Sequence, residues 1–513
     1  MTAIFSIFKI LSRMDYVFII ITVSSVIFWY LFLYKRRSPP LPPGPWGFPI
    51  VGNLPFLQRE LHTYFQGLAK KHGPIFKLRL GAKLAIVVTS PEVAQEILKT
   101  NDVIFANRNV PAVALVNSYG GNDIAWSPYG PKWRMLRKLC IHKIFSNATL
   151  DSSTDLRRRE TRRIVEYLAG QARAGSSVNL GEQIFLMIWN VVTQMLWGTT
   201  VKGEDREIFG AEFLEPFMEM NDLLLKPNVS DFFPVLSRFD LQGLVKRMGV
   251  PAQKMDQMFD RIINQRLGMD RKSDGNGEDF LDVLLKVKDE EDESMPLTMN
   301  DVKALLTNMV LGGTDTSLHV IEFAMAEILN KPDIMKRAQQ ELDEVVGKGK
   351  VVEESHIPKL AYVLAIMKET LRLHPIGPLL APHRPSKTTV VGGFTVPKDS
   401  TIFVNVWAIH RNPNVWKNPL EFDPNRFLDK SYDFNGNDFS YFPFGSGRRI
   451  CVGMAMGERV VLYILATLLH SFDWKLPQGE RVEVEEKFGI VLKLKNPLVA
   501  IPVLRLSDPN LYL

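Results

Sequence analysis

The chain has 513 residues, of which 46% are apolar and 23% charged, a composition typical of globular rather than disordered proteins. Its 62 Lys and Arg against 56 Asp and Glu give a net charge of +6, too small an excess for a dedicated nucleic-acid-binding protein. Two cysteines are too few for a disulfide framework, which favours a reducing compartment for most of the chain.

The first predicted element is a membrane anchor. Residues 16–34 carry no charge, and a helix of that length at about 1.5 Å per residue spans about 29 Å, close to one bilayer core. Three cations follow at 35–37 and outnumber the two that precede, so the positive-inside rule places the C-terminal side in the cytosol. A cleaved signal peptide is the alternative, but the apolar run is long and no small-residue cleavage site follows it. We therefore expect a luminal segment at 1–15 and a single-pass transmembrane helix at 16–34.

A hinge and one large domain are expected after the anchor. Residues 35–45 are basic and then rich in proline, which predicts a stiff spacer. The rest of the chain, 46–513, shows no internal repeat and is expected to form a single domain.

The patterns within this domain predict a mainly α fold with small β-sheets. Alternating apolar and polar residues at 74–90 predict a β-hairpin. Residues 91–290 are mostly helical in pattern, and short strand-like stretches return at 388–405 and 481–504.

Residues 297–329 predict a buried central helix, because apolar residues occupy nearly every face. Thr298 and Asp301 match a capping box at its start. In its middle, Gly312 and Gly313 precede a run of polar residues at 314–317. Two interpretations remain open from this segment alone: a packing notch for a crossing helix, or a groove for a flat ligand with a hydroxyl and a carboxylate at hand for proton delivery.

A cysteine loop, "FPFGSGRRICVG" at 442–453, predicts a metal ligand. Arg448, Arg449 and backbone N–H groups would stabilise a thiolate at Cys451, and the apolar helix that follows adds the field of its N-terminus. No second cysteine lies nearby, so zinc and iron–sulfur sites lack ligands, and a single thiolate ligand points to haem. Cys140 has the pattern of a buried small hydrophobic residue and is assigned no role.

The loop resembles, at every defined position, the haem-binding signature of the cytochrome P450 monooxygenases. Further motifs resemble those of this family in the family's order: Trp133-x-x-x-Arg137, Gly312-Gly313-Thr314-Asp315-Thr316, Glu369-x-x-Arg372 and Phe422-x-Pro424-x-Arg426-Phe427. The anchor and hinge are similar to those of its microsomal members. The C-terminal segments are similar to the plant A-type branch, most of all to a group that includes sesquiterpene hydroxylases and some flavone hydroxylases. The resemblance covers essentially the whole chain.

The resemblance implies a cytochrome P450 fold that binds haem b, with Cys451 as the ligand of its iron. Phe444 would pack near the sulfur, and two haem propionates would need cations. The cofactor-binding residues that it implies are Trp133, Arg137, His383, Arg384, Phe444, Arg449 and Cys451. Without the resemblance, Arg137 would be assigned to a solvated helix face, because other cations surround it in the sequence.

The resemblance also implies the oxygen chemistry and the electron supply. Thr316 and Asp315 would deliver the protons that dioxygen cleavage requires, whereas Glu369, Arg372 and Arg426 would form a structural triad. The chain carries no flavin or nicotinamide fingerprint, so its electrons would come from NADPH through a separate NADPH–cytochrome P450 reductase. A basic surface is the expected dock, with a generic basic surface as the alternative reading of its residues: Lys132, Arg134, Lys138 and Arg448. The protein would be anchored in the endoplasmic reticulum membrane with its catalytic domain in the cytosol.

The expected substrate is a small, neutral, hydrophobic plant secondary metabolite. The resemblance implies a pocket lined by 110–120, 308–316, 375–382 and 487–492, which carry no charge apart from Asp315 and Lys487. A terpenoid, most of all a sesquiterpene, is favoured over a flavonoid. Two other classes remain: a haem-thiolate isomerase or dehydratase that needs no reductase, and a haem carrier or sensor. Neither would need Thr316 and Asp315.

Overall fold

The computed structural model describes residues 22–25, 39–198, 204–224, 226–268, 279–289, 296–428, 432–477 and 481–513. The predicted luminal segment, most of the predicted anchor and the basic half of the hinge lie outside these residues. Within the described ranges, no helix is both long enough and apolar enough to cross a membrane.

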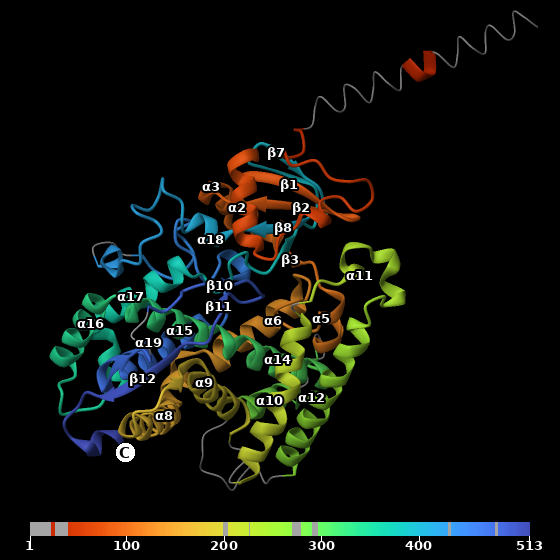
Figure 1. Ribbon diagram of the computed structural model, residues 1–513. Coiled ribbons are helices and arrows are strands. Elements are labelled where there is room, and N and C mark those ends of the chain that lie inside the picture. The colour runs from red at the N-terminus through yellow and green to blue at the C-terminus, as the bar shows by residue number, and fades with distance from the viewer. Residues whose placement is uncertain are drawn as a thin grey trace, which may run out of the picture.

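The described part is mainly helical, as predicted (Figure 1). Its α-helices are α2 (Leu61–His72), α3 (Pro91–Gln95), α4 (Asp102–Phe105), α5 (Ala112–Asn117), α6 (Pro131–Leu139), α7 (Asn147–Ser152), α8 (Thr154–Ala174), α9 (Leu180–Trp197), α10 (Glu204–Leu224), α11 (Val229–Phe232), α12 (Leu244–Leu267), α13 (Phe280–Asp289), α14 (Met299–Gly313), α15 (Asp315–Leu329), α16 (Pro332–Val345), α17 (Ala361–Leu373), α18 (Val406–Ile409) and α19 (Met454–Ser471). Its strands are β1 (Ile75–Leu80), β2 (Lys83–Val88), β3 (Asn107–Arg108), β4 (Val178–Asn179), β5 (His383–Arg384), β6 (Thr389–Val391), β7 (Phe394–Val396), β8 (Thr401–Val404), β9 (Phe472–Lys475), β10 (Glu486–Lys487), β11 (Lys493–Leu494) and β12 (Val499–Leu504).

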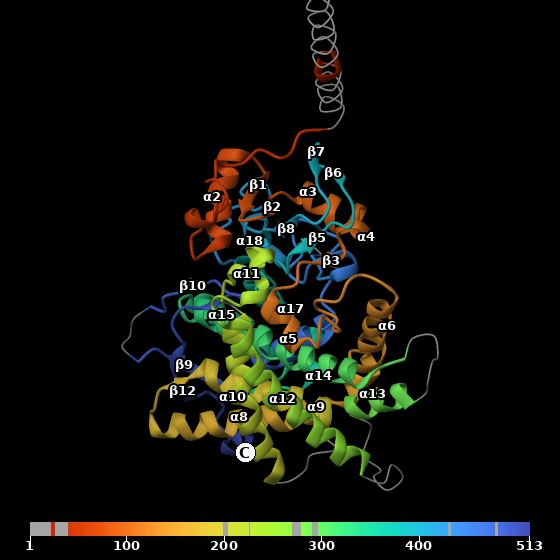
Figure 2. The same cartoon turned by 90° about the vertical axis from the view of Figure 1, so that its right-hand side faces the viewer.

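The largest sheet lies at one end of the molecule, with α2 and α3 beside it and most of the helices at the other end (Figures 1 and 2). Its strand order is β1-β2-β8-β5-β3. The predicted hairpin is β1 and β2, antiparallel with Leu80 opposite Lys83. Gly81 makes the turn between them with φ of 62°, a conformation that glycine adopts without strain. Strand β3 and the much later strands β5 and β8 complete this sheet, so it joins segments far apart in sequence.

The predicted central helix is present but divided. Its N-terminus carries the predicted capping box, in which the Thr298 side chain accepts the Asp301 N–H and the Asp301 carboxylate accepts the Thr298 N–H. The segment 297–329 forms two helices that meet just after the paired glycines: α14 ends at Gly313 and α15 begins at Asp315. Two threonine hydroxyls just after the glycines bond back to carbonyl oxygens four residues earlier, a pattern that bends helices. Both halves lie within the largest apolar cluster and pack against α9 and, for α15, against α17 and α19.

Candidate functional site

The cysteine loop turns sharply at Gly447 before the long helix α19. Gly447 has φ of 65°, and a Cβ there would lie 1.9 Å from the Leu98 carbonyl oxygen, so only glycine fits. The Cys451 N–H then donates to the Phe444 carbonyl oxygen at 3.0 Å. Because α19 begins at Met454, the sulfur precedes a helix N-terminus, as the sequence predicted.

The Cys451 side chain opens onto an internal space. It is exposed by surface area, yet enough protein surrounds it that burial raises the pKa of its thiol. A hydrogen bond from the Gly453 N–H and the charge of Arg137 act in the opposite direction and lower that pKa. Neither arginine of the loop acts as predicted on the thiolate: Arg448 pairs with Asp102 at 3.1 Å, and Arg449 donates to main-chain carbonyl oxygens. The cation that acts on this sulfur is Arg137, which the neighbouring helix supplies.

Helix α6 brings its predicted residues to the cysteine loop. The Arg137 Nη2 donates to the Ile450 carbonyl oxygen at 2.7 Å, so Arg137 does not lie on a solvated helix face. The Trp133 ring lies between two guanidinium groups, 4.4 Å from that of Arg449 and 5.5 Å from that of Arg137. Arg449 is fixed in addition by bonds to the carbonyl oxygens of residues 106, 124 and 127.

Arg108 joins this group, although sequence reasoning did not single it out. It lies on β3 and is only 8% exposed. Its Nη1 donates to the Ala381 carbonyl oxygen, whereas its Nε is buried without a partner. The adjacent strand β5 supplies His383, whose Nδ1 lies 2.8 Å from the Phe105 carbonyl oxygen and therefore carries the proton. No local pattern separates an arginine that becomes buried from one that stays in water, so the sequence held no signal for Arg108.

Three arginines form a cationic cluster, defined as Arg108, Arg137 and Arg449. His383 lies beside it as a neutral ring, because burial and the charge of Arg108 lower its pKa well below the ordinary value. Burial and the charge of Arg449 lower the pKa of Arg108 to about 9. Burial and the charge of Arg137 lower the pKa of Arg449 to about 10, partly offset by the buried carboxylate of Asp123. Buried positive charge without full compensation is costly. The cluster is therefore suited to a ligand with two carboxylates beside Cys451, and the propionates of haem fit that requirement.

Two of the predicted cofactor-binding residues, Arg384 and Phe444, lie outside the cationic cluster. The Arg384 side chain is 37% exposed and points to Asp399, 3.8 Å away, so of the pair His383 and Arg384 only His383 lies beside the cationic cluster, as a neutral ring. Phe444 is partly buried, and its ring packs edge-on against Phe434 with centroids 5.3 Å apart. That packing fixes the start of the cysteine loop.

The junction of α14 and α15 holds the predicted oxygen residues. The Thr316 hydroxyl donates to the Gly312 carbonyl oxygen at 2.8 Å. The Asp315 carboxyl accepts a bond of 3.0 Å from Asn221 on α10, a partner that the sequence did not suggest. Burial raises the pKa of Asp315, and the charges of His319 and Lys493 oppose that rise.

Each of the two glycines at this junction supports one of the two interpretations of the segment, the packing notch or the groove. A Cβ on Gly313 would lie 3.2 Å from the Val192 side chain, so Gly313 is a packing notch for α9. A Cβ on Gly312 would meet nothing within 4 Å, and Gly312 is exposed although Val310 and Thr314 are fully buried. Gly312 therefore borders an open space.

A buried ion pair supports the cysteine loop from α17. Glu369 and Arg372 are fully buried and form two parallel bonds of 2.7 and 2.8 Å. Glu369 also accepts from Arg426 at 3.3 Å, which completes the predicted triad. Arg372 donates to the His410 carbonyl oxygen at 2.9 Å, and the His410 ring accepts the Phe442 N–H at 3.0 Å. The triad is thus two hydrogen bonds from the first residue of the cysteine loop.

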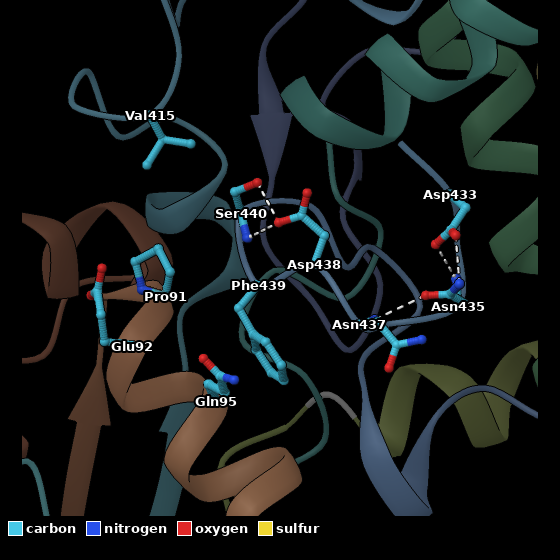
Figure 3. A pocket seen from close by; sticks show the side chains of 10 residues that line it. All are labelled: Pro91, Glu92, Gln95, Val415, Asp433, Asn435, Asn437, Asp438, Phe439 and Ser440. Carbon is cyan, nitrogen blue, oxygen red and sulfur yellow. Dashed lines mark hydrogen bonds between the residues drawn. The ribbon is translucent and has the colours of Figure 1, made fainter. Parts of the chain in front are cut away.

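A surface depression of about 620 Å³ lies apart from these residues (Figure 3). Its acidic side chains are satisfied within their own turns, Asp433 by Asn435 and Asp438 by Ser440. Phe439 forms its floor. It contains none of the predicted site residues.

Comparison with known proteins decides the family. The family model described as Cytochrome P450 matches residues 42–501. The chain belongs to the cytochrome P450 family. It is 41% identical over 488 residues to flavonoid 3'-monooxygenase CYP75B137 of Crocosmia x crocosmiiflora, covering 93% of this chain and 95% of that protein. It is 37% identical to geraniol 8-hydroxylase of Swertia mussotii, covering 95% of this chain and 99% of the relative.

The solved structures agree with this membership. A zebra fish cytochrome P450 determined with abiraterone superposes with a TM-score of 0.73 at 25% identity, covering 86% of this chain and 99% of the other. The sequence-based assignments to a plant cytochrome P450 and to its fold are confirmed, and the enzyme is a monooxygenase of that family.

Proposed function

We propose that this cytochrome P450 hydroxylates a small, neutral, apolar plant metabolite, using dioxygen and electrons that a separate reductase draws from NADPH. The observation that supports it best is the cationic cluster beside Cys451, together with pocket segments that carry almost no charge. When bound, haem supplies an iron that activates dioxygen, and thiolate ligation favours cleavage of the O–O bond.

The residues of the chain would bind and orient this cofactor. Cys451 would hold the iron as thiolate, and the Gly453 N–H that points to its sulfur would moderate the basicity of that ligand. Arg108, Arg137 and Arg449 would hold the propionates, and a charge-assisted hydrogen bond is worth about 1.5–3 kcal/mol.

The junction of α14 and α15 would move protons. Because burial raises the pKa of Asp315, its carboxyl keeps a proton at higher pH than an exposed aspartate would, which suits a proton donor. Asn221 holds that carboxyl in place from α10. The Thr316 hydroxyl, which shares the open space beside Gly312, would pass the proton inward.

Electron delivery would use the exposed face of α6. Lys132 already pairs with the buried Asp301 at 2.7 Å, and Arg448 pairs with Asp102. Arg134 and Lys138 are exposed one helical turn apart, so they are the better dock for an acidic reductase. The endoplasmic reticulum membrane, with the catalytic domain in the cytosol, is the proposed location.

A terpenoid, most of all a sesquiterpene, is the proposed substrate class, supported by the absence of a charged clamp and by relatives named for geraniol and geranylhydroquinone. A flavonoid is the second candidate, favoured by the relative at 41% identity. An isomerase, dehydratase or carrier is less favoured because the Thr316 and Asp315 pair is retained.

The test is turnover by the full chain reconstituted with haem, reductase, NADPH and isotopically labelled dioxygen. Geraniol, a sesquiterpene hydrocarbon and a flavanone are offered, and products are read by mass spectrometry. Incorporation of one labelled oxygen atom that depends on the reductase supports the proposal. Conversion without the reductase would support an isomerase. Conversion of the flavanone without conversion of any terpenoid would replace the terpenoid by a flavonoid as the substrate class.

Replacing Thr316 by alanine should separate electron use from product formation. Product formation is expected to fall on the order of 100-fold, the usual contribution of a positioned proton donor. NADPH should still be consumed, but its electrons should reduce dioxygen to hydrogen peroxide in place of forming product. Thr307→Ala is the matched control, because its hydroxyl also bonds a carbonyl oxygen four residues earlier on α14 but lies far from the junction. Equal ratios of product to NADPH in the wild type and in Thr316→Ala would remove Thr316 from the proton path.

Replacing Arg108 by methionine should weaken haem retention. Haem loss to a scavenger protein is expected to accelerate by about 10-fold to 100-fold, equivalent to one charge-assisted hydrogen bond. Arg384→Met is the matched control, since its side chain pairs with Asp399 at the surface. Faster haem loss from Arg384→Met than from Arg108→Met would reverse the assignment.

A further inference from the structure

A largely buried carboxylate lies at the start of the turn between β10 and β11. Glu486 begins β10, and four side chains from three other parts of the chain donate to its oxygens. These donors are His374 at 2.6 Å, Trp407 at 2.8 Å, Arg411 at 2.9 Å and His62 at 3.3 Å. Burial acts to raise the pKa of Glu486, but the bonds from the two histidines and the charge of Arg411 outweigh it and hold that pKa well below its ordinary value. Glu486 is therefore a fixed negative charge within the protein.

His374 joins this carboxylate to a second one. Its Nδ1 lies 2.6 Å from Glu486, and its Nε2 lies 3.0 Å from Glu327 on α15. Each ring nitrogen of His374 thus faces a carboxylate. The ring stacks on Phe323 with centroids 4.4 Å apart and planes 3° from parallel. His374 is thus held in one orientation by two charges and one aromatic face.

The His374–Glu486 pair stands where two pocket-lining segments begin. His374 directly precedes 375–382, and Glu486 directly precedes 487–492. The two segments touch, since the Leu492 N–H donates to the Ile376 carbonyl oxygen at 2.8 Å. Figures 1 and 2 show β10 beside α15, and β11 packs against α15. Through Glu327 the same pair is also tied to the helix that follows the oxygen junction.

Side-chain contacts have to hold this turn, because β10 and β11 contribute two residues each. Phe488 is fixed from α2: its N–H donates to Glu60 at 2.8 Å, and its ring stacks on His62 with centroids 5.5 Å apart. His62 in turn donates to Glu486. Glu486 therefore adds two attachments to this turn, one to α2 through His62 and one to His374.

We propose that the His374–Glu486 pair sets the separation of the two pocket walls that start at these residues, and so determines which sizes of substrate the enzyme accepts. This inference rests on the proposed function, because the resemblance assigns both segments to the pocket. His374 and Glu486 are positioning residues: they act on the walls and do not touch the reacting atoms.

The test uses two azoles that bind haem iron through nitrogen and differ in size, imidazole and 4-phenylimidazole, with affinity read from the shift in haem absorption. In Glu486→Gln, the ratio of the two dissociation constants is expected to change by about fivefold or more, within the range for residues that share one network. Imidazole alone should bind as in the wild type, because it does not reach the walls. Glu485→Gln is the matched control: it is the adjacent residue, it is exposed, and it bonds Lys495 at the surface.

A double-mutant cycle identifies the pair as the cause. If the pair acts as one unit, Glu486→Gln with His374→Asn should change the ratio no more than the larger single change, whereas two additive effects would contradict a shared role. Trp407→Phe, which removes one donor to Glu486 and keeps the ring, should shift the ratio in the same direction by a smaller factor, and it decides the question if the charge variants do not fold.

Failure of this inference is distinct from failure of the proposed function. A wild-type protein that binds neither azole would contradict the proposed function. A wild-type protein that binds both, with unchanged ratios in Glu486→Gln and Trp407→Phe, would overturn the role of the pair alone.

Discussion

Cys451→Ser is expected to abolish the red-shifted Soret band of the reduced carbon monoxide complex, the band whose position gives the family its name, so that any haem the variant retains absorbs at shorter wavelength. A serine hydroxyl is not ionised at neutral pH and cannot donate the electron density that a thiolate supplies to iron. Monooxygenase turnover should fall to background for the same reason. The measurement is the difference spectrum of the reduced protein with and without carbon monoxide, at equal protein concentration.

Cys140→Ser is the control for this result, because it makes the same chemical change at the other cysteine. Cys140 is completely buried, and burial raises the pKa of its thiol to about 12, so it stays protonated and is not a ligand. Its variant should keep the band at its normal position and lose only some stability. A normal band in Cys451→Ser, or a band lost only in Cys140→Ser, would contradict the assignment.

Arg372→Met is expected to destabilise the fold by about 3–5 kcal/mol, because it leaves the Glu369 carboxylate buried without its cation. The loss extends to the three carbonyl oxygens that Arg372 bonds, of His410, Pro419 and Glu421. Since His410 holds the first residue of the cysteine loop, haem retention should fall together with the midpoint of thermal unfolding. Both are measured on the purified holoprotein.

The matched control is Arg261→Met, the same substitution in an exposed pair. Arg261 lies 2.7 Å from Glu212, the distance seen in the buried pair, but both side chains are about half exposed. Exposed pairs contribute about 1 kcal/mol or less. An unfolding midpoint for Arg372→Met no lower than that of Arg261→Met would show that the buried pair does not stabilise the fold.

Features with local causes could be predicted from the sequence. The hairpin of β1 and β2, the capping box at Thr298 and the sharp turn at Gly447 each depend on residues within a few positions of one another. The cysteine loop was informative for the same reason. The break between α14 and α15 also has a local cause, because it follows Gly312 and Gly313, and consecutive glycines weaken a helix.

Features that need tertiary contacts could not be predicted. Arg448 and Arg449 are neighbours in sequence, yet Arg448 pairs with Asp102 and Arg449 donates to the carbonyl oxygens of residues 106, 124 and 127. Arg108 and Asn221 were missed because each acquires its role from a segment more than ninety positions away, Arg108 from the cysteine loop and Asn221 from α15. The charges and the hydrophobic periodicity along the chain carry no information on such long-range pairings.

The central claim is that one cysteine sulfur binds the iron. X-ray absorption at the iron edge tests it most directly, on the wild-type holoprotein and on Cys451→Ser at equal haem content. We predict one sulfur neighbour in the first coordination shell of the wild type and none in the variant. A wild-type shell made only of nitrogen and oxygen atoms would contradict the account.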